Sequence, residues 1–430
     1  MKVRMAKLSL LVLPALLVAT AGPAGQAGAS AAAPQVHVRG NKLVDAGGGT
    51  VVLHGVDRPG ADYQCVEGNG IFAGPTGQAS VNAMKSWDIN AVRLPLNEAC
   101  WNGESYVDPA YAGANYRKAI KAYVSLLNSD GIVVILDLQW SDGVDPGNTS
   151  CVSAEAICEK LMPDAAESVP FWSSVARTFK GNDAVLFDLF NEPYPERVLP
   201  TEDAAWECWL KGSSSCAPGI PYTVAGMQTL VNAVRATGAN NVIMLGGLSG
   251  ANDLTEWLKY EPKDPDHSLV ASWHSYNFNG CNNLQCWTSQ ISPVIASVPV
   301  IAGEIGENDC ADDYIDPLMA YLDSKDTSYL AWSWNVQRGC SAGPELISDY
   351  SGDPTNSGAG YKSHLQSLAR GHRKPPRRRS RAAGYKSHLV VVSCQAGSPP
   401  GRPVRIPSRT IWVRRRPCLM PSSSGATRQR

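Results

Sequence analysis

Three absences narrow the classes of protein to which this chain of 430 residues can belong. After the first 30 residues, no apolar run approaches the roughly 20 residues that a transmembrane helix needs, which excludes a protein with several spans. The 12 cysteines include no C-x-x-C pair or close Cys/His cluster, so we expect neither a structural zinc site nor any other cofactor. Finally, no Asp or Glu follows residue 370, which separates the C-terminal segment from the rest of the chain.

The N-terminus has the layout of a secretory signal peptide. Three cations within the first seven residues precede an apolar run over residues 8–21, and Ala27-Gly28-Ala29 offers small residues for cleavage. We therefore predict a signal peptide over 1–29, a short linker over 30–35, and a secreted, extracellular protein that leaves the membrane after cleavage. A membrane anchor is the alternative, and Pro14 within the apolar run disfavours it.

The segment between residues 34 and 370 is strongly acidic. It contains 20 Lys and Arg against all 39 acids, a formal net charge of −19, although the whole chain has a net charge of only −1. A body with this charge repels polyanions, so we expect a neutral partner and no nucleic acid.

Residues 371–430 are rich in Arg, Pro and Ser and predict a basic disordered tail. The heptapeptide at residues 359–365, AGYKSHL, recurs unchanged at residues 383–389. This repeat, and the composition that follows it, are typical of a local duplication followed by a shifted reading frame. The alternative function is a basic arm for nucleic acid or an anionic surface, which export from the cell disfavours.

The cysteines indicate an oxidising compartment, because several of them lie at short loop spacings. These spacings predict three local disulfides, Cys151 with Cys158, Cys208 with Cys216, and Cys281 with Cys286. Two further pairs, Cys65 with Cys100 and Cys310 with Cys340, would complete a set of five, but spacing alone leaves the connectivity open.

Eight short apolar, β-branched runs alternate with helical stretches, which favours a single α/β domain with a (β/α)8 TIM barrel over residues 36–370. The helical stretches include 109–128 and 222–237, whose apolar residues fall on one face. Residues 36–50 predict a hairpin that closes the barrel floor, with Gly47-Gly48-Gly49 at its turn. The predicted strands are 51–56, 90–96, 132–138, 185–190, 241–247, 269–276, 298–304 and 328–334.

Two glutamates end strands of this predicted barrel, where the reactive groups of such folds lie. Glu192 follows the fourth strand and Glu304 ends the seventh. Two carboxyl groups about 5 to 5.5 Å apart cleave a glycosidic bond with retention, one as the acid and one as the nucleophile. We predict Glu192 as the acid/base, with a pKa raised by burial and a neighbouring carboxylate, and Glu304 as the nucleophile.

The runs NAVRLPLNE, LFDLFNEP, SWHSYNF, VPVIAGEIG and LAWSWN resemble glycoside hydrolase family 5, the large cellulase family, and specifically its secreted actinobacterial branch. The resemblance covers about residues 36–370 and implies a monomeric, retaining endo-β-1,4-glucanase acting on a β-glucan. It also implies that Trp334 stacks under the sugar in subsite −1. Beside the two glutamates, the positions that match the family's active-site set are Arg93, Asn191, His274, Tyr276 and Trp334.

One position departs from that family pattern. Gln139 ends the third strand, where the family usually has His, and it precedes Trp140, a second candidate for substrate binding. Glutamine donates to a sugar hydroxyl but carries no proton charge, so we expect reduced activity or altered subsite geometry.

Two alternative functions stay open at this point. A β-mannanase on the same scaffold would differ only in loop contacts that sequence does not expose. A carbohydrate-binding protein with weakened catalysis would agree with Gln139 and the unusual tail. His274 has the alternative of a core histidine, and Asp137 is expected to be a structural partner rather than a catalyst.

Overall fold

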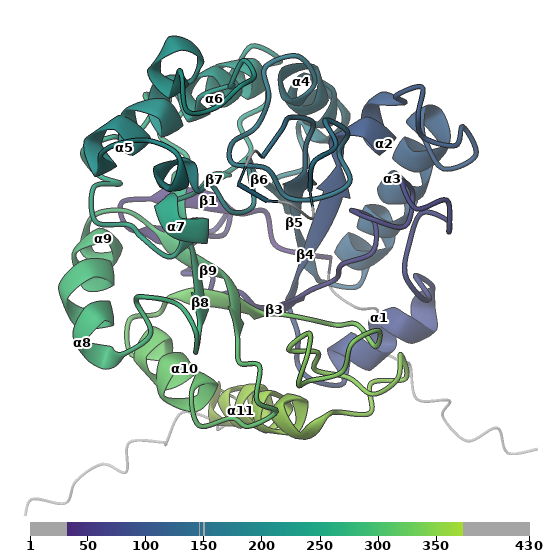
Figure 1. Ribbon diagram of the computed structural model, residues 1–430. Coiled ribbons are helices and arrows are strands. Elements are labelled where there is room, and N and C mark those ends of the chain that lie inside the picture. The colour runs from purple at the N-terminus through teal and green to yellow at the C-terminus, as the bar shows by residue number, and fades with distance from the viewer. Residues whose placement is uncertain (1–31, 146, 149–150, 373–430) are drawn as a thin grey trace, which may run out of the picture. The chain divides into compact units, whose positions relative to one another are not determined.

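The structure is a computed structural model that describes residues 32–145, 147–148 and 151–372. The predicted signal peptide, and all but the first two residues of the predicted tail, lie outside these ranges. Eight parallel strands form a closed barrel in which each strand pairs with its neighbours in the chain, and the last pairs with the first (Figure 1). The strands are β3 (His54–Asp57), β4 (Ala91–Asn97), β5 (Val133–Trp140), β6 (Val185–Asp188), β7 (Ile243–Gly246), β8 (Leu269–Tyr276), β9 (Val300–Gly306) and β10 (Ser328–Ala331).

Every predicted strand overlaps one of these eight, so the predicted (β/α)8 barrel is confirmed. The strands form because both of their faces are buried, one against the barrel interior and one against the helices, and such strands read as apolar runs. The strands β4 and β9, for example, are buried at every residue.

Helices surround the barrel as an outer ring (Figure 1). The predicted helical stretch 109–128 corresponds to α3. Its buried residues form the apolar face that its periodicity predicts, and they are Tyr116, Ile120, Tyr123, Val124 and Leu127. The helices are α1 (Gln78–Lys85), α2 (Glu98–Asn102), α3 (Gly113–Ser129), α4 (Ser168–Phe179), η1 (Pro195–Arg197), α5 (Glu202–Lys211), η2 (Ser213–Cys216), α6 (Met227–Arg235), α7 (Leu248–Ala251), α8 (Leu284–Cys286), η3 (Trp287–Ile291), α9 (Ser292–Ser297), α10 (Ile315–Asp323) and α11 (Asn356–His372).

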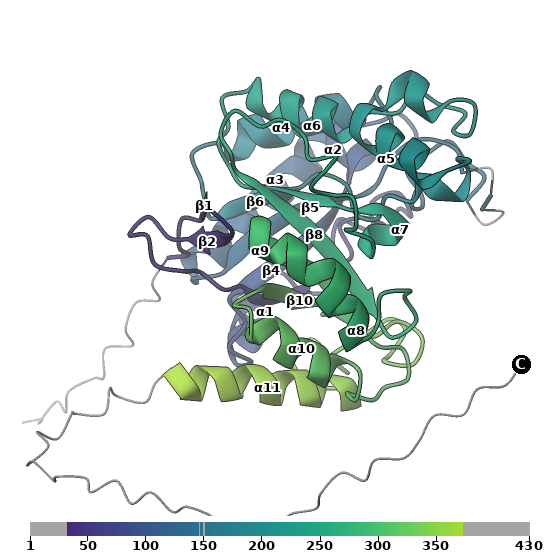
Figure 2. The same ribbon diagram turned by 90° about the vertical axis from the view of Figure 1, so that its left-hand side faces the viewer.

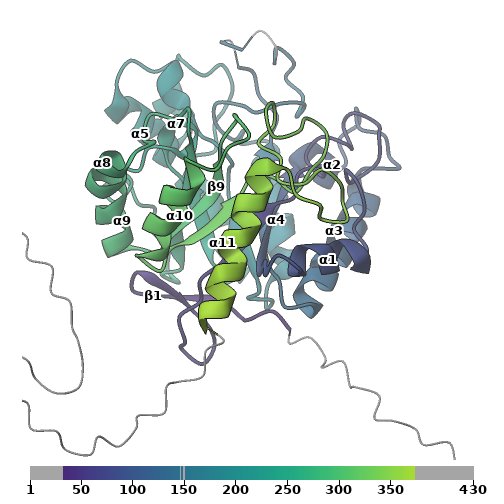
Figure 3. The ribbon, with the colours of Figure 1, turned by 90° about the horizontal axis from the view of Figure 1, so that it is seen from below.

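The last helix, α11, seals the barrel where its first and last strands meet, and Figure 3 shows it passing between α10 and α1. His364 contacts Asp323 at the end of α10 at 2.8 Å, and Gln366 donates to the carbonyl of Ser86 after α1 at 3.0 Å. Tyr361 donates to the carbonyl of Gly55 in β3 at 2.5 Å. These contacts join the two ends of the barrel along the chain.

A short hairpin, β1 (His37–Arg39) and β2 (Lys42–Val44), lies at the end of the barrel where the strands begin (Figure 2). Val36 and Leu43 pack in one cluster with the first residues of β4 and β5, Ala91 and Val133. The predicted closure of the barrel floor is therefore confirmed.

The predicted position of the hairpin turn was wrong. Arg39 pairs with Lys42, so the turn is the two-residue Gly40-Asn41, where Gly40 has a φ of +61°. Two-residue turns that contain a residue with positive φ match the right-handed twist of the two paired strands. The glycines at 47–49 form a separate turn after β2, closed by a bond from the Gly49 amide to Asp45 at 2.8 Å.

The three predicted local disulfides are present, and the pairing that spacing alone leaves open is also the observed one, which gives five bridges: Cys65–Cys100, Cys151–Cys158, Cys208–Cys216, Cys281–Cys286 and Cys310–Cys340. Most of them staple loops rather than the barrel, and the first joins the loop after β3 to α2. Across the part of the chain that the structure describes, no helix is both long enough and apolar enough to cross a bilayer.

Candidate active site

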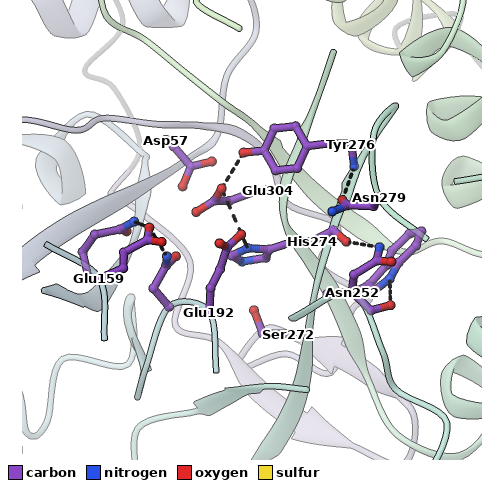
Figure 4. Close-up of polar contacts among 12 residues, drawn as sticks. Asp57, Glu159, Glu192, Asn252, Ser272, His274, Tyr276, Asn279 and Glu304 are labelled. Atoms are coloured by element: carbon purple, nitrogen blue, oxygen red, sulfur yellow. Dashed lines mark hydrogen bonds and ion pairs between the residues drawn. The ribbon is translucent and has the colours of Figure 1, made fainter. Parts of the chain in front are cut away.

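Two glutamates face each other where the strands end (Figure 4). Glu192 lies four residues beyond the end of β6, and Glu304 lies within β9, two residues before its end. One oxygen of each carboxyl lies within 4.8 Å of the other, and the ring of His274 lies beside both. Its Nδ1 is 2.9 Å from Glu192 Oε1 and 3.7 Å from Glu304 Oε2. This separation is shorter than the roughly 6.5 to 9.5 Å that is typical of an inverting pair and agrees with the spacing of a retaining pair.

Both oxygens of Glu304 accept a hydrogen bond from a fixed donor. Arg93, from β4, donates to Oε1 at 2.8 Å, and the Tyr276 hydroxyl, at the end of β8, donates to Oε2 at 2.5 Å. All three side chains are buried. Charge-assisted bonds of this kind are stronger than neutral ones, so they fix the carboxylate in one orientation.

Arg93 is the centre of the barrel interior. Besides Glu304 and the Asn191 oxygen, its guanidinium contacts three buried aspartates at 3.0 to 3.1 Å. One of these is Asp137, which confirms its predicted structural role. Burial works against the charge on Arg93, but the surrounding carboxylates raise its pKa well above the ordinary value. Burial also raises the pKa of Asp57 and that of Asp137 well above the ordinary value of an aspartate. The single cation of Arg93 is therefore not surrounded by carboxyls that are all ionised.

Glu192 has the environment of a proton donor. Burial raises its pKa to about 7, although Arg93 and Arg197 act in the opposite direction. A quarter of its side chain is exposed, so substrate and solvent can reach it. Burial lowers the pKa of His274 to about 4, so this histidine is neutral at the pH where Glu192 holds its proton. A neutral ring with its hydrogen on Nδ1 can donate to Glu192.

Asn191 and Gln139 converge on a third carboxyl, that of Glu159. Each side-chain amide donates to Glu159 Oε1 at 3.1 Å, and the Asn191 oxygen accepts from Arg93 at 2.9 Å. Figure 4 shows Glu159 on the side of Glu192 away from Tyr276. Sequence analysis missed Glu159, because it lies in the long loop between β5 and α4, outside every strand end. Its position directly after the Cys151–Cys158 disulfide is the feature that could have drawn attention to it.

A cleft of about 250 Å³ adjoins this cluster, and Gln139 and Glu159 are among the residues that line it. Trp140, at the end of β5, lines the cleft as predicted and lies 6.3 Å from the ring of Tyr63. Trp334 does not line it: the side chain is fully buried and packs edge-on against Trp87 at 4.9 Å. Trp332, two residues earlier, lines the cleft instead.

Two groups of described residues have donors within the reach of a single cation. One is the set Glu192, His274 and Glu304, and the other is Glu307, Asp309 and Asp313 in the loop after β9. In the first group both oxygens of Glu304 already accept from Arg93 and Tyr276, so this arrangement suits acid–base and nucleophilic chemistry better than metal binding.

Comparison with known proteins agrees with this geometry. The family described as "Cellulase (glycosyl hydrolase family 5)" matches residues 53–338. Endoglucanase B of Clostridium cellulovorans is 26% identical over 223 residues, which are 50% of this chain and 45% of that protein, so the chain spans under half of that relative. A mannan endo-1,4-beta-mannosidase of Streptomyces lividans is 23% identical over 80% of this chain and 76% of its own length.

The fold recurs in solved structures. A beta-glucanase of Saccharophagus degradans, solved in complex with cellotetraose, has a TM-score of 0.59 at 19% identity and covers 79% of this chain and 95% of its own. The beta-mannanase of Thermomonospora fusca has a TM-score of 0.53 at 19% identity and covers 75% and 92%. With two-thirds of the chain matched by one family and the barrel shared, the chain belongs to the cellulase family of glycoside hydrolases, family 5.

Proposed function

We propose that the protein is a retaining endo-β-1,4-glucanase that hydrolyses internal bonds of a β-glucan by double displacement. The observation that carries this proposal is the distance between the carboxyl oxygens of Glu192 and Glu304, within 4.8 Å. A gap of this size suits direct attack by one carboxylate while the other protonates the leaving oxygen.

In the first step, Glu304 attacks the anomeric carbon and Glu192 gives its proton to the departing glycosidic oxygen. A covalent glycosyl-enzyme forms, and the free chain end leaves. In the second step, Glu192 takes a proton from water as that water attacks the same carbon, which releases Glu304. Arg93 and Tyr276 hold the nucleophile in line, and Asn191 donates to the sugar 2-hydroxyl.

Aromatic rings hold the sugar beside the pair. Trp140 and Trp332 line the cleft, and we propose Trp332, rather than the predicted Trp334, as the ring that stacks on the sugar nearest the reacting bond. His274, which contacts both glutamates, orients Glu192 through its Nδ1 hydrogen.

Trapping with a 2-deoxy-2-fluoro β-cellobiosyl donor tests the proposal. The fluorine slows the second step, so the enzyme should gain the mass of one disaccharide, and peptide mapping should place it on Glu304. Label on another residue, or hydrolysis with inverted configuration by NMR of the first product, would overturn the proposal. Binding without any label would support instead a carbohydrate-binding protein with weakened catalysis.

A β-mannanase is the second candidate, and it is favoured by the Streptomyces lividans relative, which covers more of this chain than the endoglucanase does. Glucose and mannose differ only at carbon 2, so initial rates on soluble β-glucan and on mannan, measured at equal chain concentration, separate the two. We further propose that the protein acts outside the cell as a monomer, and the five disulfides support an oxidising location.

A further inference from the structure

The third carboxyl of the site, Glu159, is held in place from two directions. The Cys151–Cys158 disulfide closes a short loop immediately before it. Its backbone oxygen accepts from the hydroxyl of Tyr194 at 3.2 Å, and Tyr194 lies two residues after Glu192. The loop that carries Glu159 is thereby tied to the segment that carries the proposed acid/base, and the carboxyl cannot drift from it without breaking these links.

The carboxyl in turn fixes two side-chain amides. Oε1 of Glu159 accepts from Asn191 Nδ2 and from Gln139 Nε2, each at 3.1 Å. The Asn191 oxygen accepts from Arg93 while its nitrogen donates to Glu159, so only one orientation of this side-chain amide satisfies both bonds. A continuous chain of contacts then runs from Glu159 through Asn191 and Arg93 to Glu304.

We propose that Glu159 is a positioning residue of this glycosidase site, which orients the Asn191 and Gln139 amides so that they meet the sugar in the reacting subsite. This inference rests on the proposed function. Asn191 retains one amide hydrogen for the sugar 2-hydroxyl, and that contact strengthens in the transition state. The buried oxygen of Gln139 has no partner among the described residues and is free to accept from a sugar hydroxyl.

Glu159 performs this role in its neutral form. Burial raises its pKa to about 8, and the charges of Glu192, Glu304 and Asp62 act in the same direction, while the bond from Gln139 opposes them. Between pH 5 and 7 the side chain therefore keeps its proton, and Oε1 accepts the two amides as a carbonyl oxygen does. Glutamine is the neutral match in shape for this state, whereas alanine removes the acceptor.

The same arrangement accommodates glutamine at position 139. A histidine there would meet a carboxyl 20 residues further along the chain, and in this protein an uncharged amide meets an uncharged acid. The pair is therefore buried without an ionised Glu159, whose negative charge next to Glu192 and Glu304 would be strongly repelled.

Steady-state kinetics on a soluble β-glucan at pH 6 test the role of Glu159. Glu159→Ala should lower kcat about tenfold to a hundredfold with KM within about twofold, because the lost contact acts mainly in the transition state. Glu159→Gln should recover most of that loss. The matched control is Glu155→Ala, an exposed glutamate inside the same disulfide loop, which should behave as wild type.

A double-mutant cycle decides whether Glu159 acts through Asn191. On an Asn191→Ala background, Glu159→Ala should cost clearly less than it does in the wild type, because only the Gln139 amide is then left for Glu159 to orient. Additive losses, an unchanged kcat in Glu159→Ala, or equal losses in the Glu155 control would each overturn the proposal. Fluoro-sugar labelling of the wild type is run in parallel: absence of label refutes the glycosidase itself, whereas label together with an unaffected Glu159→Ala refutes only this inference.

Discussion

With Glu192 as the proposed acid, we expect its raised pKa to set the alkaline limit of activity, and Arg197 offers a way to move that limit. A pKa of about 7 keeps about nine-tenths of Glu192 protonated at pH 6, compared with about 3% for a glutamate at its ordinary value. The raised pKa therefore supplies about a thirtyfold larger population of the acid form. Since the acid must be protonated to act, kcat/KM should fall as the pH rises through about 7.

Arg197 lowers this pKa through its charge, yet it is exposed and lies over the ring of Tyr194 at 4.2 Å. Arg197→Gln removes the cation without opening the core. An exposed charge screened by solvent contributes about 0.3 to 0.7 kcal/mol, so the alkaline limb should move upward by about 0.2 to 0.5 pH units. The sign follows because a lost cation favours the protonated, neutral form of Glu192.

The assay is kcat/KM on a soluble β-glucan between pH 4 and 10, fitted for its alkaline pKa, at low salt where surface charges act most strongly. Arg177→Gln, which removes an exposed arginine from α4, is the control and should leave the profile in place. An alkaline limb near pH 5 in the wild type, or a downward shift in Arg197→Gln, would refute the assignment of Glu192 as the buried acid.

Three further changes probe individual contacts. Tyr276→Phe removes the donor to Glu304 and should lower kcat/KM about tenfold to a hundredfold with little change in melting temperature, measured by kinetics and calorimetry. Trp332→Ala should raise KM about tenfold and change kcat less, because the ring lines the cleft; an unchanged KM would place the sugar elsewhere. Gln139→His restores the residue usual in the family and should raise turnover several-fold, and an unchanged kcat would remove the basis for treating Gln139 as a defect.

Much of the fold follows from sequence because its signals are local and repeated. Each strand is an apolar run between helical stretches, and eight such units leave few architectures other than a closed barrel. The same regularity placed Arg93, His274, Tyr276 and Glu304 in one site, because parallel strands deliver their ends to one face of the barrel. Disulfide pairing followed from short spacings, since a bridge across five to eight residues has few competitors.

The features that sequence could not predict depend on contacts between loop segments, which have no repeating hydrophobic pattern. Trp332 and Trp334 both lie beyond β10, which ends at Ala331, whereas the predicted strand continued three residues further, so strand periodicity says nothing about which of the two rings faces the cleft. Glu159 lies in a loop whose path is set by a disulfide and by a bond to Tyr194, neither of which has a strand-like pattern. The hairpin turn was misplaced because two glycine-containing turns compete within a few residues, and the shorter one is preferred.

The charges of the barrel interior show why the two glutamates can have different roles although they are near neighbours. Arg93 contacts Glu304 directly but is separated from Glu192, which contacts the neutral ring of His274 instead. A carboxyl beside a guanidinium gains a fixed cation, whereas a buried carboxyl beside a neutral ring keeps its proton. On the proposed mechanism, the strand that supplies Arg93 thus decides which glutamate attacks and which donates. Exchanging the two roles would require moving that arginine across the barrel, which no single substitution achieves.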